Sequence, residues 1–449
     1  MIRNKLLAVL LTGVIVLNTP LAALAATEQQ RSDSVHGAVN YLETQQAADG
    51  GIKDGAFGDV SDWAIVAVEV ADLDPANVKT KSGTSLEDYS KRNVPNTNDP
   101  DTKLLTVEKK MISIKASGKD TANFEGADYD QILASKEVNG QFGDETALND
   151  DYFGILASEG TNNQDLKTLA ASSLNFVITN QSKKDGGFSH TTSAEVCYEG
   201  TCYPVGSDSN STSAAIQAMY AAERMGITHD KLDTSRDGAV IYLLKLQNAD
   251  GGFRLGADSG VSDTASTSWA LMALNLVGDS KKNEITRAQN WLLSVQNPDG
   301  GFRFMSSCLP GETWCSNSSA EYTSHAIIAL LGSSWSLNPE PLELMPLSKP
   351  VFSNNIFFNN IQSEIIEEAK TDLTSFASAS SAASRFTLAA KNAQQENFKI
   401  AATDSPSNKK VAAKESNLSV IGLSVLAAFA LGWFTWFMVK SKQTGGSNV

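Results

Sequence analysis

The sequence has few charged residues, few histidines and few cysteines, and its charge is mainly of one sign. Of its 449 residues only 19% are charged, and there are 36 Lys and Arg but 51 Asp and Glu, which gives a formal net charge of −15. Nucleic-acid binding depends on basic side chains that neutralise phosphates, so the composition argues against a nucleic-acid partner. With only 12 Pro and 32 Gly, the chain is not a collagen-like or proline-rich fibrous protein.

The N-terminal segment has the pattern of a secretory signal. Arg3 and Lys5 precede an uncharged apolar run over residues 6–17, and Ala23-Leu24-Ala25 has the small residues of a cleavage site. This pattern predicts a signal peptide over residues 1–25 and a mature chain that begins at Ala26.

A second long apolar run lies near the C-terminus. Residues 420–439 carry no charge, and at about 1.5 Å per residue a helix of this length spans a bilayer core of about 30 Å. Lys440 and Lys442 follow directly, as is typical of a cytoplasmic flank. We therefore expect a single transmembrane helix within residues 417–440, a cytoplasmic tail at 441–449, and the remainder outside the cell.

The four cysteines fall into two local pairs. Cys197 and Cys202 lie in one polar, turn-rich segment, and Cys308 and Cys315 lie in another. An oxidising compartment favours a disulfide within each pair. A zinc site built from all four remains an alternative, because the spacing of the first pair is also found in zinc sites. We predict disulfides and no metal site.

A turn with the pattern Gln-x-x-Asp-Gly-Gly recurs along the chain. Clear copies lie at residues 46–52, 181–188, 247–253 and 296–302, with a degenerate copy at 139–144. Helix-like apolar spacing precedes each clear copy. The Gly pair supplies the positive φ that ends a helix.

A second pattern follows each turn. It joins a helix-capping residue, a small residue, a branched aliphatic and a second small residue, in segments that begin at residues 61, 151, 212, 267 and 323. Ser, Thr and Asp at these starts suggest N-caps, and small residues on one face let helices approach closely. About 10–12 helices fit between residues 32 and 335, arranged as stacked hairpins. The longest interval between two copies of this second pattern runs from residue 61 to residue 151. It holds a polar insertion near residues 79–101 and a helix-like stretch at 104–114.

The amino-acid composition changes after residue 335. Residues 336–369 contain proline and a short apolar run, and they are a candidate sixth hairpin that completes the repeat domain. Residues 370–416 are rich in Ala and Ser, a composition that buries little, and they read as a solvated stalk.

The turns, together with Thr267-Ser268-Trp269-Ala270-Leu271-Met272-Ala273-Leu274, resemble the repeats of the squalene–hopene cyclase and protein prenyltransferase superfamily. The resemblance covers about residues 32–335 and implies an all-α fold, an α/α toroid over residues 26–335 in which inner and outer helices alternate around a cavity. Periodicity alone does not distinguish a closed toroid from an open solenoid.

The catalytic motifs of this superfamily are incomplete here. Terpene cyclases of this kind protonate substrate with Asp-x-Asp-Asp, and the nearest stretch, Leu148-Asn149-Asp150-Asp151, lacks the first Asp. Asp150 and Asp151 read instead as helix N-caps. Protein prenyltransferases hold zinc with Asp, Cys and His, and no Asp-x-Cys occurs. The Cys-Gly-Glu-Gln of complement-like thioester domains is also absent, and the stalk leaves no second domain of the kind found in cobalamin carriers.

If the N-terminal ends of the inner helices face the cavity, several side chains would line it. His325 occupies the position that aromatic residues hold in three other copies. The candidate cavity-lining residues are Asp62, Trp63, Asp150, Asp151, Asp263, Trp269, Glu321 and His325. The five acids would form an acidic rim able to hold a cation such as Ca²⁺, which prefers oxygen ligands, although an acid at a helix N-terminus is favoured by the helix dipole alone.

The sequence therefore predicts a membrane-anchored extracytoplasmic toroid that binds an extracellular ligand in its cavity or loops, without cyclase or prenyltransferase chemistry. Two alternatives stay open: an exported enzyme, cyclase-like or acting on polysaccharide as a lyase, and a structural or adhesion module. No catalytic residue is assigned.

Overall fold

A computed structural model describes residues 26–95, 103–198, 201–308, 312–337 and 345–346. The predicted signal peptide, the stalk, the transmembrane segment and most of residues 336–369 lie outside these ranges and stay predictions. Within the described ranges, no helix is both long enough and apolar enough to cross a membrane.

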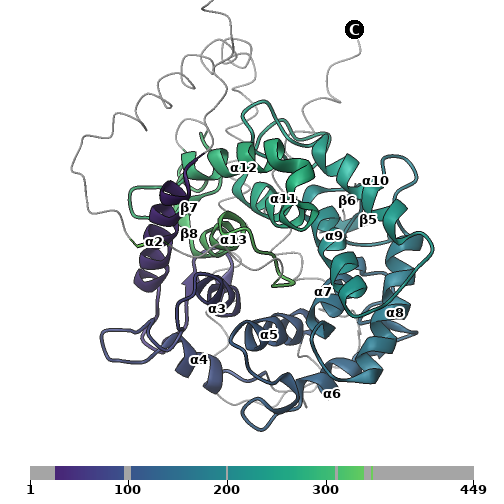
Figure 1. Ribbon diagram of the computed structural model, residues 1–449, viewed down its shortest axis with the longest axis horizontal. Helices are drawn as coiled ribbons and strands as arrows, with labels where there is room; N and C mark the ends of the chain where they lie inside the picture. Colours follow the sequence, from purple (N-terminus) through teal and green to yellow (C-terminus); the bar gives the residue numbers. More distant parts are fainter. Residues whose placement is uncertain (1–25, 96–102, 199–200, 309–311, 338–344, 347–449) are drawn as a thin grey trace, which may run out of the picture.

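The fold is an α/α toroid, in which two concentric layers of helices surround one axis (Figure 1). The six inner helices are α3 (Ser61–Val70), α5 (Leu104–Ala116), α7 (Leu148–Ser158), α9 (Ser209–Arg224), α11 (Thr264–Val277) and α13 (Ala320–Leu330). The six outer helices are α2 (Glu28–Thr44), α4 (Leu86–Arg92), α6 (Tyr129–Ala134), α8 (Gln164–Thr179), α10 (Leu232–Leu244) and α12 (Lys282–Ser294). Each outer helix is followed by an inner helix, which confirms the predicted helical hairpins.

The inner ring is closed. Each inner helix packs against the next, and α13 packs against α3. The sixth inner helix is α5, which comes from the helix-like stretch at 104–114, so the ring closes without a hairpin from residues 336–369. Whether those residues pack on the domain lies outside the described ranges.

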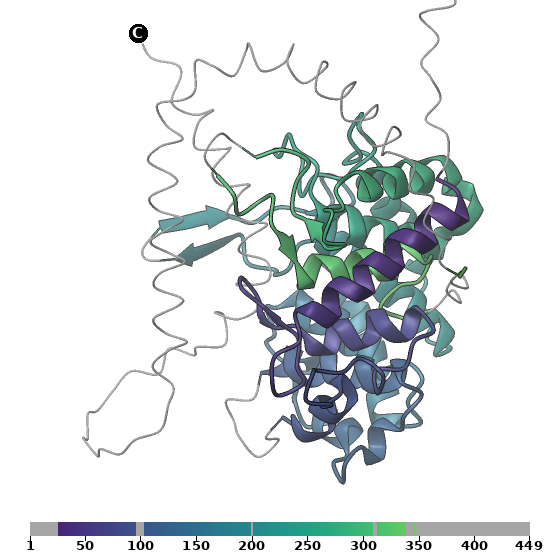
Figure 2. The same cartoon turned by 90° about the vertical axis from the view of Figure 1, so that its left-hand side faces the viewer.

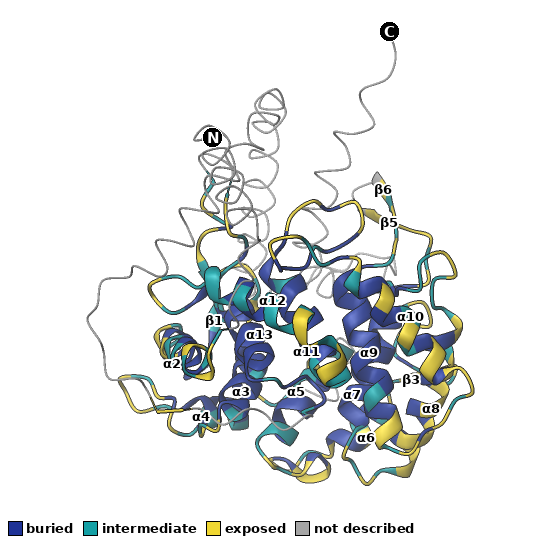
Figure 3. Ribbon diagram, turned by 45° about the horizontal axis from the view of Figure 1, so that its top comes forward, coloured by how far each residue is buried: buried dark blue, intermediate teal, exposed yellow. Residues whose placement is uncertain are grey.

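Burial follows the two layers. Every residue of α7 and of α13 is buried, whereas the outer helices expose one face (Figure 3). Fully buried alanines such as Ala64, Ala215, Ala270 and Ala326 lie where inner helices pack together. This confirms that the small residues of the repeat allow close helix packing.

The Asp-Gly-Gly turns join the outer to the inner helix of a hairpin, and three of them pack against the next outer helix of the ring. At Gly300, φ is +91° and a Cβ atom would lie 2.1 Å from the main-chain oxygen of Gly37, in the following outer helix. The Asp299 carboxylate accepts a 3.0 Å hydrogen bond from the Gly301 amide. The Phe302 side chain after the turn is fully buried. Only glycine fits the first Gly position, because a side chain would be strained and would also clash.

Three of the predicted N-caps were misplaced by four residues. Asp208 and Asp263 cap α9 and α11, and Ser319 caps α13. The threonines of the repeat lie inside the helices, where their hydroxyls accept hydrogen bonds from the buried Phe amides after the turns: Thr212 from Phe188, Thr267 from Phe253 and Thr323 from Phe302, each at 2.9 Å.

Asp150 and Asp151 are not N-caps either. The N-cap position of α7 is Ala147, which makes no side-chain cap bond. Asp150 accepts instead from the Asp144 amide at 3.0 Å, and Asp151 accepts from the Phe142 amide at 3.2 Å. Asp151 therefore does at the degenerate turn what the threonines do at the clear ones.

Four short two-stranded antiparallel sheets lie in the loops between the described helices. The antiparallel pairs are β1 (Lys53–Asp54) with β2 (Gly58–Asp59), β3 (Glu137–Val138) with β4 (Gln141–Phe142), β5 (Glu195–Tyr198) with β6 (Thr201–Pro204), and β7 (Phe302–Arg303) with β8 (Ser318–Ser319). The short 3₁₀ helices are η1 (Thr121–Asn123) and η2 (Gly278–Lys281). Figure 2 shows the β5–β6 hairpin projecting from the body of the ring.

Both predicted disulfides form. Cys197 bonds to Cys202 across the β5–β6 hairpin, and Cys308 bonds to Cys315 in the loop between β7 and β8. No cysteine is free, so the alternative of a four-cysteine zinc site is not realised.

Candidate functional site

Four aromatic side chains from four inner helices meet around the toroid axis. Trp63 of α3 lies 5.9 Å from Phe153 of α7, measured between ring centroids, and Phe153 lies 5.9 Å from Trp269 of α11. His325 of α13 is 5.8 Å from Trp269 and 6.2 Å from Trp63. The contacts form a closed circle, which we call the axial ring. Of the candidate cavity-lining residues, the structure brings Trp63, Trp269 and His325 together here.

A fifth aromatic side chain fills the axis. Trp335 follows the last inner helix, and its ring centroid lies 4.3 Å from that of Trp63, 5.7 Å from Trp269 and 5.2 Å from His325. Its main-chain amide donates a 2.9 Å hydrogen bond to the Gln217 side chain of α9. Only 1% of Trp335 is exposed. At this level the axis is packed with aromatic rings, and the hollow implied by the resemblance is closed from the C-terminal side of α13.

An acid, a base and a cation lie beside the axial ring. Glu321 is one turn before His325 on α13, and its Oε1 lies 3.4 Å from the His325 Nε2. The Lys109 ammonium of α5 lies 5.0 Å from the centroid of the Trp63 ring. Glu321 and His325 are buried, whereas Lys109 is partly exposed. This group, Lys109, Glu321 and His325, is called the polar triad below.

The surroundings of the triad set its protonation. Burial raises the pKa of Glu321 to about 7, although the Lys109 charge acts in the opposite direction. Burial also lowers the pKa of His325 to about 3, and the Lys109 charge lowers it further. At neutral pH the imidazole is therefore uncharged, and Glu321 is close to the midpoint of its titration. Such a carboxyl can gain or lose a proton at little cost.

Several buried polar atoms around the axis have no hydrogen-bond partner among the described residues. They are both ring nitrogens of His325, both side-chain amide atoms of Asn149 and the indole nitrogen of Trp335. The Glu321 contact does not satisfy His325, because its geometry is not that of a hydrogen bond. Buried polar groups in folded proteins nearly always have a partner. These atoms therefore have an unmet capacity for hydrogen bonds.

A second group of buried acids lies between α5 and α7. Glu108 is fully buried and neither of its carboxylate oxygens has a partner in the described part of the chain. Burial raises its pKa well above the usual range, and the charges of Asp150 and Asp151 raise it further. Burial also raises the pKa of Asp150 to about 6 and that of Asp151 to about 7. Because their pKa values are raised, these three acids bind protons more readily than ordinary carboxylates do.

The five predicted acids do not converge on one point in the described part of the chain. Asp263 is the N-cap of α11, where it accepts from the Ser266 amide at 2.7 Å. Asp62 accepts a 2.9 Å hydrogen bond from the Ser113 hydroxyl. Among the described residues, the one group of three potential metal ligands that converge is Glu195 with Cys197 and Cys202, and these two cysteines are disulfide-bonded. The expected Ca²⁺ site therefore lacks a converging set of carboxylates.

Sequence reasoning missed Lys109, the buried and unpartnered side chain of Asn149, and Trp335. Lys109 stands four residues before Ser113, as Trp63 stands four before Ala67, so aligning α5 with the other inner helices would have placed Lys109 at the axis. That alignment was hidden because no Asp-Gly-Gly turn precedes α5. Trp335 lies beyond the last repeat and carried no such signal.

Residues 132–343 match the family described as the prenyltransferase alpha-alpha toroid domain. These residues are similar in sequence to the toroid repeats of that family. The matched part begins in α6, and α2–α5 complete the toroid outside it. A comparison with curated protein sequences gives no match.

Solved structures resemble the toroid domain at low sequence identity. A polysaccharide lyase is 11% identical with a TM-score of 0.50, over 68% of this chain and 96% of the other. A glycosyl hydrolase family 88 protein from Bacteroides vulgatus is 11% identical with a TM-score of 0.49, over 67% and 97%. A type II terpene cyclase from Scytonema is 16% identical with a TM-score of 0.44, over 68% and 98%. At such identities the likeness concerns the fold and not the activity.

Proposed function

We propose that this protein is a membrane-anchored, extracytoplasmic toroid that binds an extracellular ligand at its axis, without cyclase or prenyltransferase chemistry. The observation that carries the proposal is the set of unpartnered buried polar atoms on His325, Asn149 and Trp335. Leaving a buried donor or acceptor unsatisfied costs about 1–3 kcal/mol. A ligand that supplies the missing hydrogen bonds recovers that free energy on binding.

The location rests on the two terminal apolar segments and on the disulfides. Residues 1–25 have the pattern of a signal peptide, and residues 420–439 could span a membrane. Two disulfides are typical of a chain that folds in an oxidising compartment. The same features hold for a binding protein and for an exported enzyme.

The chemistry of the axis indicates what the ligand offers. Asn149 presents one donor and one acceptor group, and neutral His325 presents one of each. Lys109 adds a positive charge that favours an acceptor oxygen. The tryptophans of the axial ring surround these groups with apolar side chains. A polar ligand rich in hydroxyl or carbonyl groups therefore fits better than a hydrocarbon chain.

The test is a thermal-shift screen of the full chain in detergent against peptides, glycans, corrinoids and lipids. We expect at least one polar compound to raise the melting temperature of the wild type and to have no effect on His325→Leu. A flat response across all four classes would contradict the proposal. A compound that shifts both proteins equally would show binding away from the axis and would also count against it.

A second candidate function, an exported enzyme, is favoured by one observation. The pKa of Glu321 is raised to about 7 next to a neutral imidazole, which is the state expected of a group that transfers protons. Its test is product formation from polyprenoid or acidic polysaccharide substrates. An enzyme would turn over in the wild type and stop in Glu321→Gln while substrate binding persists.

A further inference from the structure

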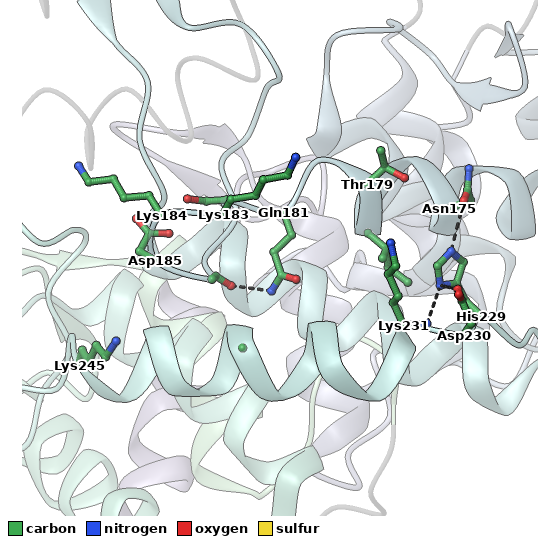
Figure 4. A pocket seen from close by; sticks show the side chains of 14 residues that line it. Asn175, Thr179, Gln181, Lys183, Lys184, Asp185, His229, Asp230, Lys231 and Lys245 are labelled. Carbon is green, nitrogen blue, oxygen red and sulfur yellow. Dashed lines mark hydrogen bonds and ion pairs between the residues drawn. The ribbon is translucent and has the colours of Figure 1, made fainter.

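A groove of about 610 Å³ lies on the outside of the ring, away from the axial ring. It runs between α10 and the turn after α8, and Figure 4 shows Lys183 and Lys184 on the turn with α10 beneath them. We call it the α8–α10 groove. None of its lining residues belongs to the axial ring or to the polar triad.

The groove is open because one outer helix has a glycine where another has an arginine. Gly251 approaches Arg287 in the following outer helix, and Gly186 approaches Gly238 in the same way. The Arg287 guanidinium covers its turn by donating hydrogen bonds to the Asn248 and Ala249 main-chain oxygens. Gly238 has no side chain to do this, so the corresponding turn stays uncovered.

The groove is positively charged although the chain as a whole is strongly negative. It is lined by Lys183, Lys184, Lys231 and Lys245. No hydrogen bond or ion pair joins these four ammonium groups to any described residue. Of the two acids in the lining, Asp185 accepts from the Gly187 amide and from the Ser207 hydroxyl, and the Asp230 side chain is 83% exposed, so four cations face two acids. The four cations are therefore free to bind an anion.

The spacing of the lysines indicates an elongated ligand. Lys231 immediately precedes α10 and Lys245 immediately follows it (Figure 4). These positions are separated by about 21 Å along the axis, at 1.5 Å per residue. A single phosphate or one acidic sugar cannot reach both. A linear molecule with repeated negative charges can.

The other lining residues favour a carbohydrate over a nucleic acid. Asn175, Thr179 and Ser182 offer amide and hydroxyl groups that suit sugar hydroxyls. No Phe, Tyr or Trp lines the groove, so it lacks the flat aromatic surfaces on which single-stranded bases stack. We propose that the α8–α10 groove binds a segment of acidic polysaccharide several sugars long.

The experiment measures binding of the full chain in detergent to polygalacturonate oligosaccharides and to chondroitin sulfate by calorimetry. Polygalacturonate carries carboxylates alone and chondroitin sulfate carries both carboxylates and sulfates, so tighter binding of the second indicates a contribution of sulfate. Wild type is expected to bind at least one of them, and to bind more weakly as salt is raised because the contact is electrostatic. We expect the double variant Lys184→Ala/Lys231→Ala to lose at least tenfold in affinity. The variant Gly238→Arg, which imitates the covered turn, is expected to lose binding as well.

The matched control is Lys81→Ala/Lys282→Ala, which removes the same charge from exposed positions outside the groove. It is expected to bind within about twofold of the wild type, and His325→Leu is expected to bind normally, since the axis is not involved. No binding of either probe, equal loss in the control, equal binding of uncharged dextran, or equal binding of oligodeoxythymidylate would each overturn the proposal. Circular dichroism and melting temperature identify any variant that fails to fold, and Gly238→Arg and the double variant test the groove independently.

Discussion

The side-chain amide of Gln296 donates a 2.8 Å hydrogen bond to the main-chain oxygen of Ser34, and so joins the last turn of the toroid to its first helix. The same nitrogen donates to the Gly300 oxygen at 2.8 Å. Gln181 makes the matching pair of contacts, to Gly186 and to Ser235 of the next hairpin. The contact that closes the ring is thus the same contact that joins hairpins within the chain.

The closing turn should tolerate no side chain at its first glycine. We predict that Gly300→Ala lowers the free energy of unfolding by more than about 3 kcal/mol, because positive φ and a clash with the Gly37 main chain add together. Urea denaturation measures the change. Gly58→Ala is the control: its φ is +74° but nothing lies within 4 Å of the added Cβ atom, so we expect a loss of only about 1–2 kcal/mol. Equal losses in the two variants would contradict the close approach.

Unpartnered polar side chains at the axis should lower the stability of the fold. We predict that Asn149→Leu raises the free energy of unfolding by about 1–2 kcal/mol, because the native amide is buried without a partner. Differential scanning calorimetry of the ligand-free chain measures the effect. The matched variant Asn275→Leu should do the opposite, since the Asn275 amide donates to the Ala329 and Ser333 oxygens at 3.1 Å. A destabilised Asn149→Leu would show that the amide already has a partner.

The polar triad should make stability depend on pH in a defined direction. The pKa of Glu321 is raised, so the folded state binds its proton more tightly than the unfolded state does. Stability is therefore highest below the unfolded pKa and falls as pH rises from about 4.5 to about 7. We predict that Glu321→Gln removes this fall, so that its stability relative to wild type increases by up to about 3 kcal/mol between pH 4.5 and pH 8.

Denaturation midpoints at several pH values test this prediction. His325 and His190 act in the opposite direction, since burial lowers both pKa values and stability from them is lost as pH falls below about 6.5. Their contribution is common to wild type and to Glu321→Gln, so it cancels in the difference to the extent that the substitution leaves the imidazoles unperturbed. A difference that does not vary with pH would show that Glu321 titrates normally.

The two disulfides should differ in what they stabilise. Each closes a short loop, so the entropic contribution is about 2–3 kcal/mol for both. Cys315 is fully buried against Phe304 and Tyr322, whereas the hairpin that carries Cys197 and Cys202 projects from the ring. We predict that Cys308→Ser/Cys315→Ser lowers the melting temperature more than Cys197→Ser/Cys202→Ser does, and that the second variant exposes the hairpin to proteolysis. A larger melting-temperature loss in the second variant would contradict this.

The repeats predicted the architecture well because each depends on local chemistry. An Asp-Gly-Gly turn must end a helix, and a row of alanines must lie against another helix, wherever they occur. The N-caps were predicted wrongly because a threonine hydroxyl can accept a hydrogen bond from more than one kind of main-chain amide. The Thr267 hydroxyl could cap a helix, but in the fold it accepts from the Phe253 amide after the turn. Trp335 could not have been placed, since its partners come from α3, α9, α11 and α13 and meet only in three dimensions.

The contact between Gln296 and Ser34 has a consequence for how the domain comes apart. An open stack of repeats can fray from either end, because its terminal units have only one neighbour. Here α13 packs against α3, and the first helix is bonded to the last turn, so no hairpin is terminal. Detaching one hairpin breaks two interfaces, and the domain should melt in one cooperative step without the gradual loss of end repeats seen in linear arrays.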